Sequence, residues 1–182
     1  MNSLPIENLS PERAFLIYAV RSAVSGNLSA CLPTVVPAVA NPSIDWAIVA
    51  DEAVYHGVVP QLYWFLQEFG LDAVSAEVRE SLHRYFQDNL RHNLVLTGEL
   101  WRILEMFKAE GISAIPFKGP TLAMLAYGDL AWREFTDLDI LVDERDLVKV
   151  GELLASAGYK SRMDLSLLSD PVFTTIEREF YF

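Results

Sequence analysis

The sequence predicts an α/β protein of the α+β kind, in which an N-terminal helical region packs on a small mixed sheet. Apolar residues recur at intervals of three and four through most of residues 11–110, as on one face of a helix. From residue 112 onward, short apolar runs alternate with Gly, Pro and Asp. The 182 residues are 52% hydrophobic, enough to bury a full core. We expect a helical region at 1–110 and an αβ core at 111–182.

Each helix expected in the first half has a recognisable start or end. Ser10-Pro11 provides an N-cap followed by proline at the first helical position, and Gly26 ends a helix over about residues 11–25. Residues 27–42 contain three prolines and suit an irregular connection. Two shorter helices should follow, one within 43–56 that ends at Gly57 and one that Pro60 opens and Gly70 ends.

Residues 75–110 contain Gly98 but no proline, and their apolar positions keep helical spacing. This pattern predicts one long helix or two helices in series, ended by Gly111.

The pattern changes to short strands at Ile112. ISAIPF is expected to form a strand, and Pro120 begins a helix that ends near Gly128. DLDILV is the second expected strand, and Asp143 then caps a helix that ends at Gly158. We expect two further strands, YKSRM and TTIEREFYF. Because the chain ends on aromatic residues, we expect either a homo-oligomer or a core truncated at the C-terminus.

Charge and cysteine content limit the function classes. The net charge of −11 opposes binding to a long nucleic acid, because Lys and Arg supply most of that affinity. A single nucleotide can still bind where a cation and a few basic groups are placed locally. Cys31 is the sole cysteine, so no internal disulfide forms. Without a signal peptide or an apolar run of membrane-spanning length, the expected location is the cytoplasm and no membrane partner is expected.

Lys118-Gly119 stands where a predicted strand turns into a helix. Glycine lets the backbone approach a ligand, the first turn of the helix has unpaired N–H groups, and Lys118 adds a positive charge, so a phosphate would be stabilised here. The alternative is that Gly119-Pro120 is only the turn that the fold requires.

Asp137 and Asp139 form an Asp-x-Asp pair at the head of a strand, where side chains two apart lie on one face. Two such carboxylates can share a hard cation, and their mutual repulsion calls for a metal ion, Lys or Arg. The alternative is that one aspartate caps the preceding loop, although this explains only one of the two.

Arg133 lies four residues before Asp137. It either pairs with one of the aspartates or faces a triphosphate, and we favour a role in binding or ordering the site. Tyr127 and Trp132 flank the same loop, where core packing is the favoured role and stacking on a base the alternative. His56, His83 and His92 lack the spacing of metal ligands.

Four features follow one another along the chain: Lys-Gly, a short helix, Arg-x-x-x-Asp-x-Asp, and a helix that leads into Gly-Tyr. This order resembles the DNA polymerase beta-like nucleotidyltransferase superfamily. More narrowly, FKGPTLAMLAYGDLAWREFTDLDILVDERDLVKVGELLASAGYK is similar to an uncharacterised bacterial nucleotidyltransferase family. The resemblance is strongest over 112–160, extends weakly to 56–66 and 93–110, and omits the first forty residues.

This resemblance implies a sheet of the polymerase beta-like type, with Asp137 and Asp139 as catalytic metal ligands and Gly119 at the nucleotide phosphates. Such enzymes hold two Mg²⁺ ions about 3.5–4 Å apart, which align an acceptor hydroxyl with the α-phosphate. Two departures stand out. Pro120 replaces the usual Ser or Gly, so Lys118 would substitute electrostatically, and the third acid would be Glu177, Glu179 or a residue beyond 182.

We therefore expect a Mg²⁺-dependent nucleotidyltransferase that moves an NMP group from an NTP to a hydroxyl of a small molecule or protein. The expected site comprises catalytic, metal-binding Asp137 and Asp139, with nucleotide-binding Lys118, Gly119 and Arg133. The alternative is a catalytically inactive nucleotidyltransferase fold that serves as a binding or regulatory module.

Overall fold

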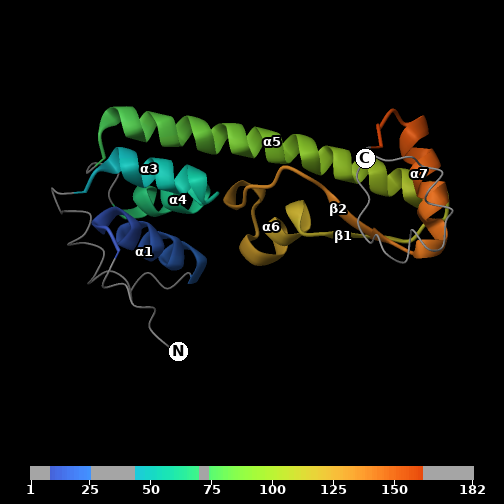
Figure 1. Ribbon diagram of the computed structural model, residues 1–182, viewed down its shortest axis with the longest axis horizontal. Helices are drawn as coiled ribbons and strands as arrows, with labels where there is room; N and C mark the ends of the chain where they lie inside the picture. The colour runs from blue at the N-terminus through green and yellow to red at the C-terminus, as the bar shows by residue number, and fades with distance from the viewer. Residues whose placement is uncertain (1–8, 26–43, 70–73, 162–182) are drawn as a thin grey trace. The chain divides into compact units, whose positions relative to one another are not determined.

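The computed structural model describes residues 9–25, 44–69 and 74–161 (Figure 1). Contacts along the chain divide it into two compact units. The first unit comprises Met1–Leu96 with Gly119–Asp137, and the second comprises Thr97–Lys118 with Leu138–Phe182. The predicted domain boundary between residues 110 and 111 stays a prediction.

Helices α1 (Pro11–Ser25), α3 (Trp46–Tyr55) and α4 (Val59–Phe69) confirm three predicted helices of the first unit. Helix α3 begins at Trp46 because the Asp45 carboxylate caps it, accepting the Ala47 N–H at 2.9 Å. Pro60 lies in the first turn of α4, where its missing N–H costs no hydrogen bond.

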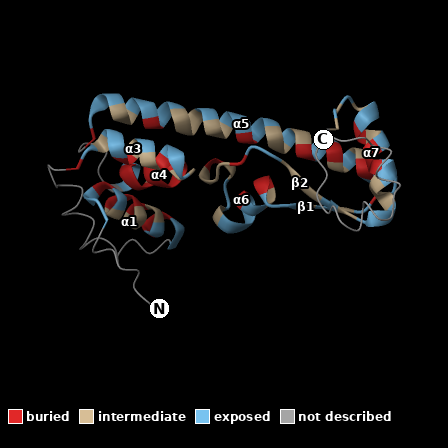
Figure 2. Ribbon diagram, in the orientation of Figure 1, coloured by how far each residue is buried: buried red, intermediate tan, exposed pale blue. Residues whose placement is uncertain are grey.

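The core of the first unit is an apolar cluster between α1, α3 and α4 (Figure 2, red). Phe15 packs edge-on against Phe65 with ring centroids 5.8 Å apart, and both side chains are fully buried. Truncating a phenylalanine in such a core to alanine typically costs about 3–5 kcal/mol of stability. The cluster therefore gives the first unit a core of its own.

Helix α5 (Ala76–Ala109) is one helix, which settles the choice between one helix and two. Gly98 does not interrupt it, and Gly111 ends it with a φ of +71° that glycine adopts without strain. Its 34 residues extend roughly 50 Å at 1.5 Å per residue. Residues up to Leu96 belong to the first unit and later residues to the second.

The second unit contains strands β1 (Ala114–Phe117) and β2 (Asp139–Val142), which pair antiparallel with Ile115 opposite Leu141. One sheet face packs with Ile103 and Phe107 of α5 and with Val150 and Leu154 of α7 (Leu147–Ser156). Ile115, Phe117 and Leu141 remain exposed on the other face.

The two strands that the structure describes pair antiparallel, and with the helices they agree with the predicted α+β fold, whereas a larger mixed sheet stays a prediction. The predicted strand at 159–163 does not form over its described part, 159–161. Gly158 turns the chain at a φ of +95°, and the Tyr159 hydroxyl bonds the Glu99 carboxylate on α5. The rest of that strand and the whole of 174–182 lie outside the described residues.

Three short elements complete the fold. Helix α6 (Gly119–Tyr127) follows β1, and the 3-10 turn η4 (Leu130–Trp132) follows α6 in the first unit. After β2, Asp143 caps the 3-10 turn η5 (Glu144–Asp146), not α7 directly, and α7 starts at Leu147. None of the described helices is both long and apolar enough to cross a membrane.

Candidate functional site

Lys118 and Asp139 form an ion pair at one end of the two-stranded sheet. The register places Phe117 opposite Asp139, so Lys118, the next residue, reaches the carboxylate: Nζ lies 3.3 Å from Oδ2. Both side chains are partly exposed, at 49% and 35%. Such exposed pairs contribute only about 0–1 kcal/mol to stability, so the fold does not depend on this one.

The backbone at Lys118 has an unfavourable conformation. Its φ is +55°, in the left-handed region, and that of Gly119 is +38°. A side chain in this region costs about 1–2 kcal/mol, which glycine avoids. Such strained residues cluster at binding and catalytic sites. Helix α6 begins at Gly119, directly after Lys118, so the predicted order of strand, turn and helix is confirmed.

Asp137 lies near Gly119 within the first unit. A Cβ added to Gly119 would lie 3.5 Å from the Asp137 carbonyl oxygen, which is an ordinary contact, so φ and not space favours glycine there. The Asp137 side chain is exposed.

Arg133 does not pair with Asp137 or Asp139 in the part of the chain that the structure describes. Its guanidinium carbon lies 5.9 Å from the centroid of the Phe135 ring. Its Nη1 is buried and has no hydrogen-bond acceptor among the described residues. Of the cations considered for Asp139, Lys118 is the one that the structure brings to it.

The segment that carries Arg133 is held by three side-chain amides that were not predicted from the sequence. Gln61 of α4 and Asn89 and Asn93 of α5 donate hydrogen bonds to backbone carbonyls of residues 130–133. Asn89 and Asn93 are four residues apart and thus on one helix face. Asparagines at that spacing on a largely apolar face were the signal in the sequence.

Tyr127 and Trp132 pack into an aromatic group of the first unit. The Trp132 ring lies 5.0 Å from that of Trp64 and 6.2 Å from that of Tyr127. This packing favours the core role for both side chains over the role of a base platform.

The two aspartates fit a magnesium ion in ligand type. Carboxylate oxygens are the ligands that Mg²⁺ prefers. Over residues 9–25, 44–69 and 74–161, no group of three or more His, Cys, Asp and Glu side chains is placed to hold a metal. His56 lies beside Glu52 and His83 bonds the Tyr63 hydroxyl, so both have other partners. Glu177 and Glu179 lie outside the described residues.

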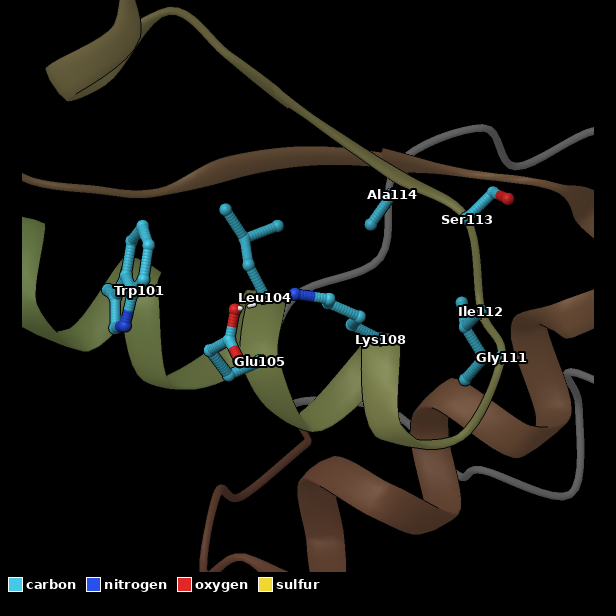
Figure 3. A pocket seen from close by; sticks show the side chains of 8 residues that line it. All are labelled: Trp101, Leu104, Glu105, Lys108, Gly111, Ile112, Ser113 and Ala114. Carbon is cyan, nitrogen blue, oxygen red and sulfur yellow. Dashed lines mark ion pairs between the residues drawn. The ribbon is translucent and has the colours of Figure 1, made fainter.

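An open hollow of about 480 Å³ lies elsewhere in the second unit (Figure 3). Trp101, Leu104, Glu105 and Lys108 of α5 line one side, and residues 111–114 line the other. Glu105 and Lys108 form an ion pair across one helix turn at 3.5 Å. None of the predicted site residues lines this hollow.

Comparison with known proteins places the chain in a family. A family model described as uncharacterised nucleotidyltransferase matches residues 42–179, well over half of the chain. No curated protein and no solved structure matches it. The matched range includes Lys118, Gly119, Arg133 and both aspartates. This protein therefore belongs to the uncharacterised nucleotidyltransferase family.

Proposed function

We propose that this protein transfers an NMP group from an NTP to a hydroxyl of a small molecule or protein, with Mg²⁺ as cofactor. The observation that carries the proposal is the Lys118–Asp139 ion pair, which lies beside the strained turn at the start of α6. The pair brings together a lysine, whose ammonium group can bind phosphate, and an aspartate, whose carboxylate can bind a metal ion. The family match supports the reaction class.

Lys118 and Gly119 are proposed to bind the triphosphate. The unpaired N–H groups in the first turn of α6 favour an anion, and glycine lets it approach the backbone closely. The Lys118 ammonium is a compact charge on a flexible stem, so it can turn from Asp139 to a phosphate oxygen. That movement would free the Asp139 carboxylate. Arg133, whose Nη1 finds no acceptor among the described residues, is proposed as a second cation for the phosphates.

Asp137 and Asp139 are the residues that would hold magnesium. When bound, Mg²⁺ supplies positive charge that stabilises the phosphate oxygens during transfer. The acceptor hydroxyl oxygen attacks the α-phosphorus, its proton passes to solvent, and the bond to the β-phosphate oxygen breaks to release pyrophosphate. The protein aligns these groups and forms no covalent bond to them.

The net charge of −11 favours a small or protein acceptor over a long nucleic acid, because a polyanion would be repelled at low salt. The alternative function is a catalytically inactive module that binds nucleotide or a partner.

Titration calorimetry with ATP and Mg²⁺ tests nucleotide binding. We expect wild-type protein to bind and Asp137→Asn and Asp139→Asn to lose most of the affinity. Equal affinity in both variants would contradict the metal site. Incubation with α-³²P-labelled NTPs and cell extract then separates the two functions: label that becomes attached to an acceptor indicates the enzyme, and binding without transfer indicates the module.

A further inference from the structure

Three amide side chains, here called the amide clamp, hold the backbone of residues 130–133. Gln61 Nε2 donates to the Trp132 carbonyl at 2.6 Å and Asn89 Nδ2 to the Ala131 carbonyl at 3.2 Å. Asn93 Nδ2 donates to the Leu130 carbonyl at 2.7 Å and to the Arg133 carbonyl at 2.8 Å. Four successive carbonyls thus accept from side chains of two helices, all within the first unit.

Asn93 is the central member of the clamp. Its side chain is fully buried, and its single amide nitrogen bonds both ends of the segment. Gln61 is also buried, at 4% exposure. The Leu130 and Arg133 carbonyls accept these bonds in a partly buried setting, so an apolar side chain in place of Asn93 would remove a hydrogen-bond donor from both of them. Asn93 therefore supplies two of the four hydrogen bonds that hold the segment, more than either other member of the clamp.

The held segment ends at Arg133, whose guanidinium group includes a buried hydrogen-bond donor. Nη1 of Arg133 finds no acceptor among the described residues, and leaving a charged donor buried without one is costly. A phosphate oxygen would satisfy it, since guanidinium groups match phosphate geometry. An arginine fixed before the ligand arrives loses less entropy on binding than one on a free loop.

We propose that Asn93, supported by Gln61 and Asn89, is a positioning residue that holds Arg133 in the conformation that binds the NTP phosphates. This inference rests on the proposed function and deepens it. It assigns nucleotide affinity to a helix residue that need not touch the nucleotide.

The test is a double-mutant cycle on the full chain, with the Kd for ATP in the presence of Mg²⁺ measured by calorimetry. Asn93→Leu, Arg133→Met and the double variant are compared with wild type. Leu82→Ala is the matched control, because Leu82 lies on the same helix and is buried in the core of the first unit but makes none of the hydrogen bonds of the clamp. Asn89→Ala is a milder probe should Asn93→Leu fail to fold.

We expect Asn93→Leu to raise the Kd about tenfold or more and Asn89→Ala to raise it less, as misplacement of a ligand contact does. In the Arg133→Met background, Asn93→Leu should add little further loss. Leu82→Ala should lower the melting temperature but leave the Kd unchanged.

Two results would overturn the inference while leaving the proposed function intact. One is ATP binding with the wild-type Kd in both Asn93→Leu and Asn89→Ala. The other is a full additional loss from Asn93→Leu in the Arg133→Met background, which would mean that Asn93 acts by another route. Absence of ATP binding in the wild type would instead overturn the proposed function, and the inference with it.

Discussion

Lys118 Nζ lies 3.3 Å from Asp139 Oδ2, and this lysine has a left-handed backbone conformation. The exposed ion pair contributes little to stability, while the backbone conformation costs stability. A lysine whose backbone conformation lowers stability by more than its ion pair raises it is best explained by a function. The first two predictions test this relationship.

Asp139→Asn should change the free energy of unfolding by less than about 1 kcal/mol, because it removes only a partly exposed ion pair. It should nevertheless lower affinity for ATP and Mg²⁺ strongly, because a metal-type carboxylate is lost. Asp143→Asn is the matched control, since Asp143 lies at the other end of β2 and asparagine caps a helical turn equally well. Denaturant unfolding and calorimetry give both readouts, and equal loss of affinity in the two variants would contradict the assignment.

Lys118→Gly and Lys118→Ala both remove the ammonium group, but only glycine relieves the positive φ. We expect the glycine variant to be more stable than the alanine variant by about 1 kcal/mol, measured by urea unfolding. Both should bind ATP more weakly than wild type, and by similar factors, because the charge is what contacts phosphate. Wild-type affinity in either variant would rule out the phosphate contact.

Glu134 should make the protein less stable as pH rises. Burial raises the pKa of its carboxyl group, although the Tyr85 hydroxyl, which donates to Oε2 at 3.0 Å, lowers that pKa in part. The folded state therefore keeps a proton that the unfolded state loses, and the free energy of unfolding falls from pH about 4.5 through the raised pKa and then levels off. Glu134→Gln should abolish this fall.

Tyr85→Phe is the companion to that measurement. It removes the hydrogen bond that favours the charged form, so the pKa of Glu134 should rise further and the fall in stability should extend to higher pH. Unfolding by urea between pH 4 and pH 8 measures both variants. An unchanged pH profile in Glu134→Gln would show that this carboxyl group does not shift on folding.

Glu99 should have the opposite effect at acidic pH. Hydrogen bonds from Arg102, and then from Tyr159, lower its pKa to about 2. The stabilisation is present above the ordinary pKa of 4.5 and is lost as pH falls from there toward 2. Since the side chain is 35% exposed and screened by solvent, Glu99→Gln should cost less than about 1 kcal/mol at neutral pH.

Thermal unfolding between pH 2 and pH 7 measures this effect. Glu105→Gln is the matched control, because Glu105 lies on the same helix and pairs with Lys108 only at 3.5 Å. Glu99→Gln should reduce the loss of stability at acidic pH. If Glu105→Gln reduced that loss as much, the contacts of Glu99 with Arg102 and Tyr159 would not be the cause of the loss.

Local signals in the sequence determined most of the described elements. Pro11, Pro60 and Gly111 mark helix ends that the structure reproduces to within a residue or two, because backbone limits at proline and glycine act without tertiary contacts. The turn from β1 into α6 at Lys118-Gly119 was predicted for the same reason. The nucleotidyltransferase family was also predicted from the sequence, since the order of its motifs agrees with the family match.

Tertiary structure alone decided which side chains meet. Asp139 pairs with Lys118 and not with Arg133, because strand register brings residues 118 and 139 together across twenty intervening positions. Gln61, Asn89 and Asn93 converge on residues 130–133 only once α4, α5 and that segment have packed. Helix and turn signals reflect the conformational limits of a few neighbouring residues, whereas these contacts depend on packing between distant parts of the chain.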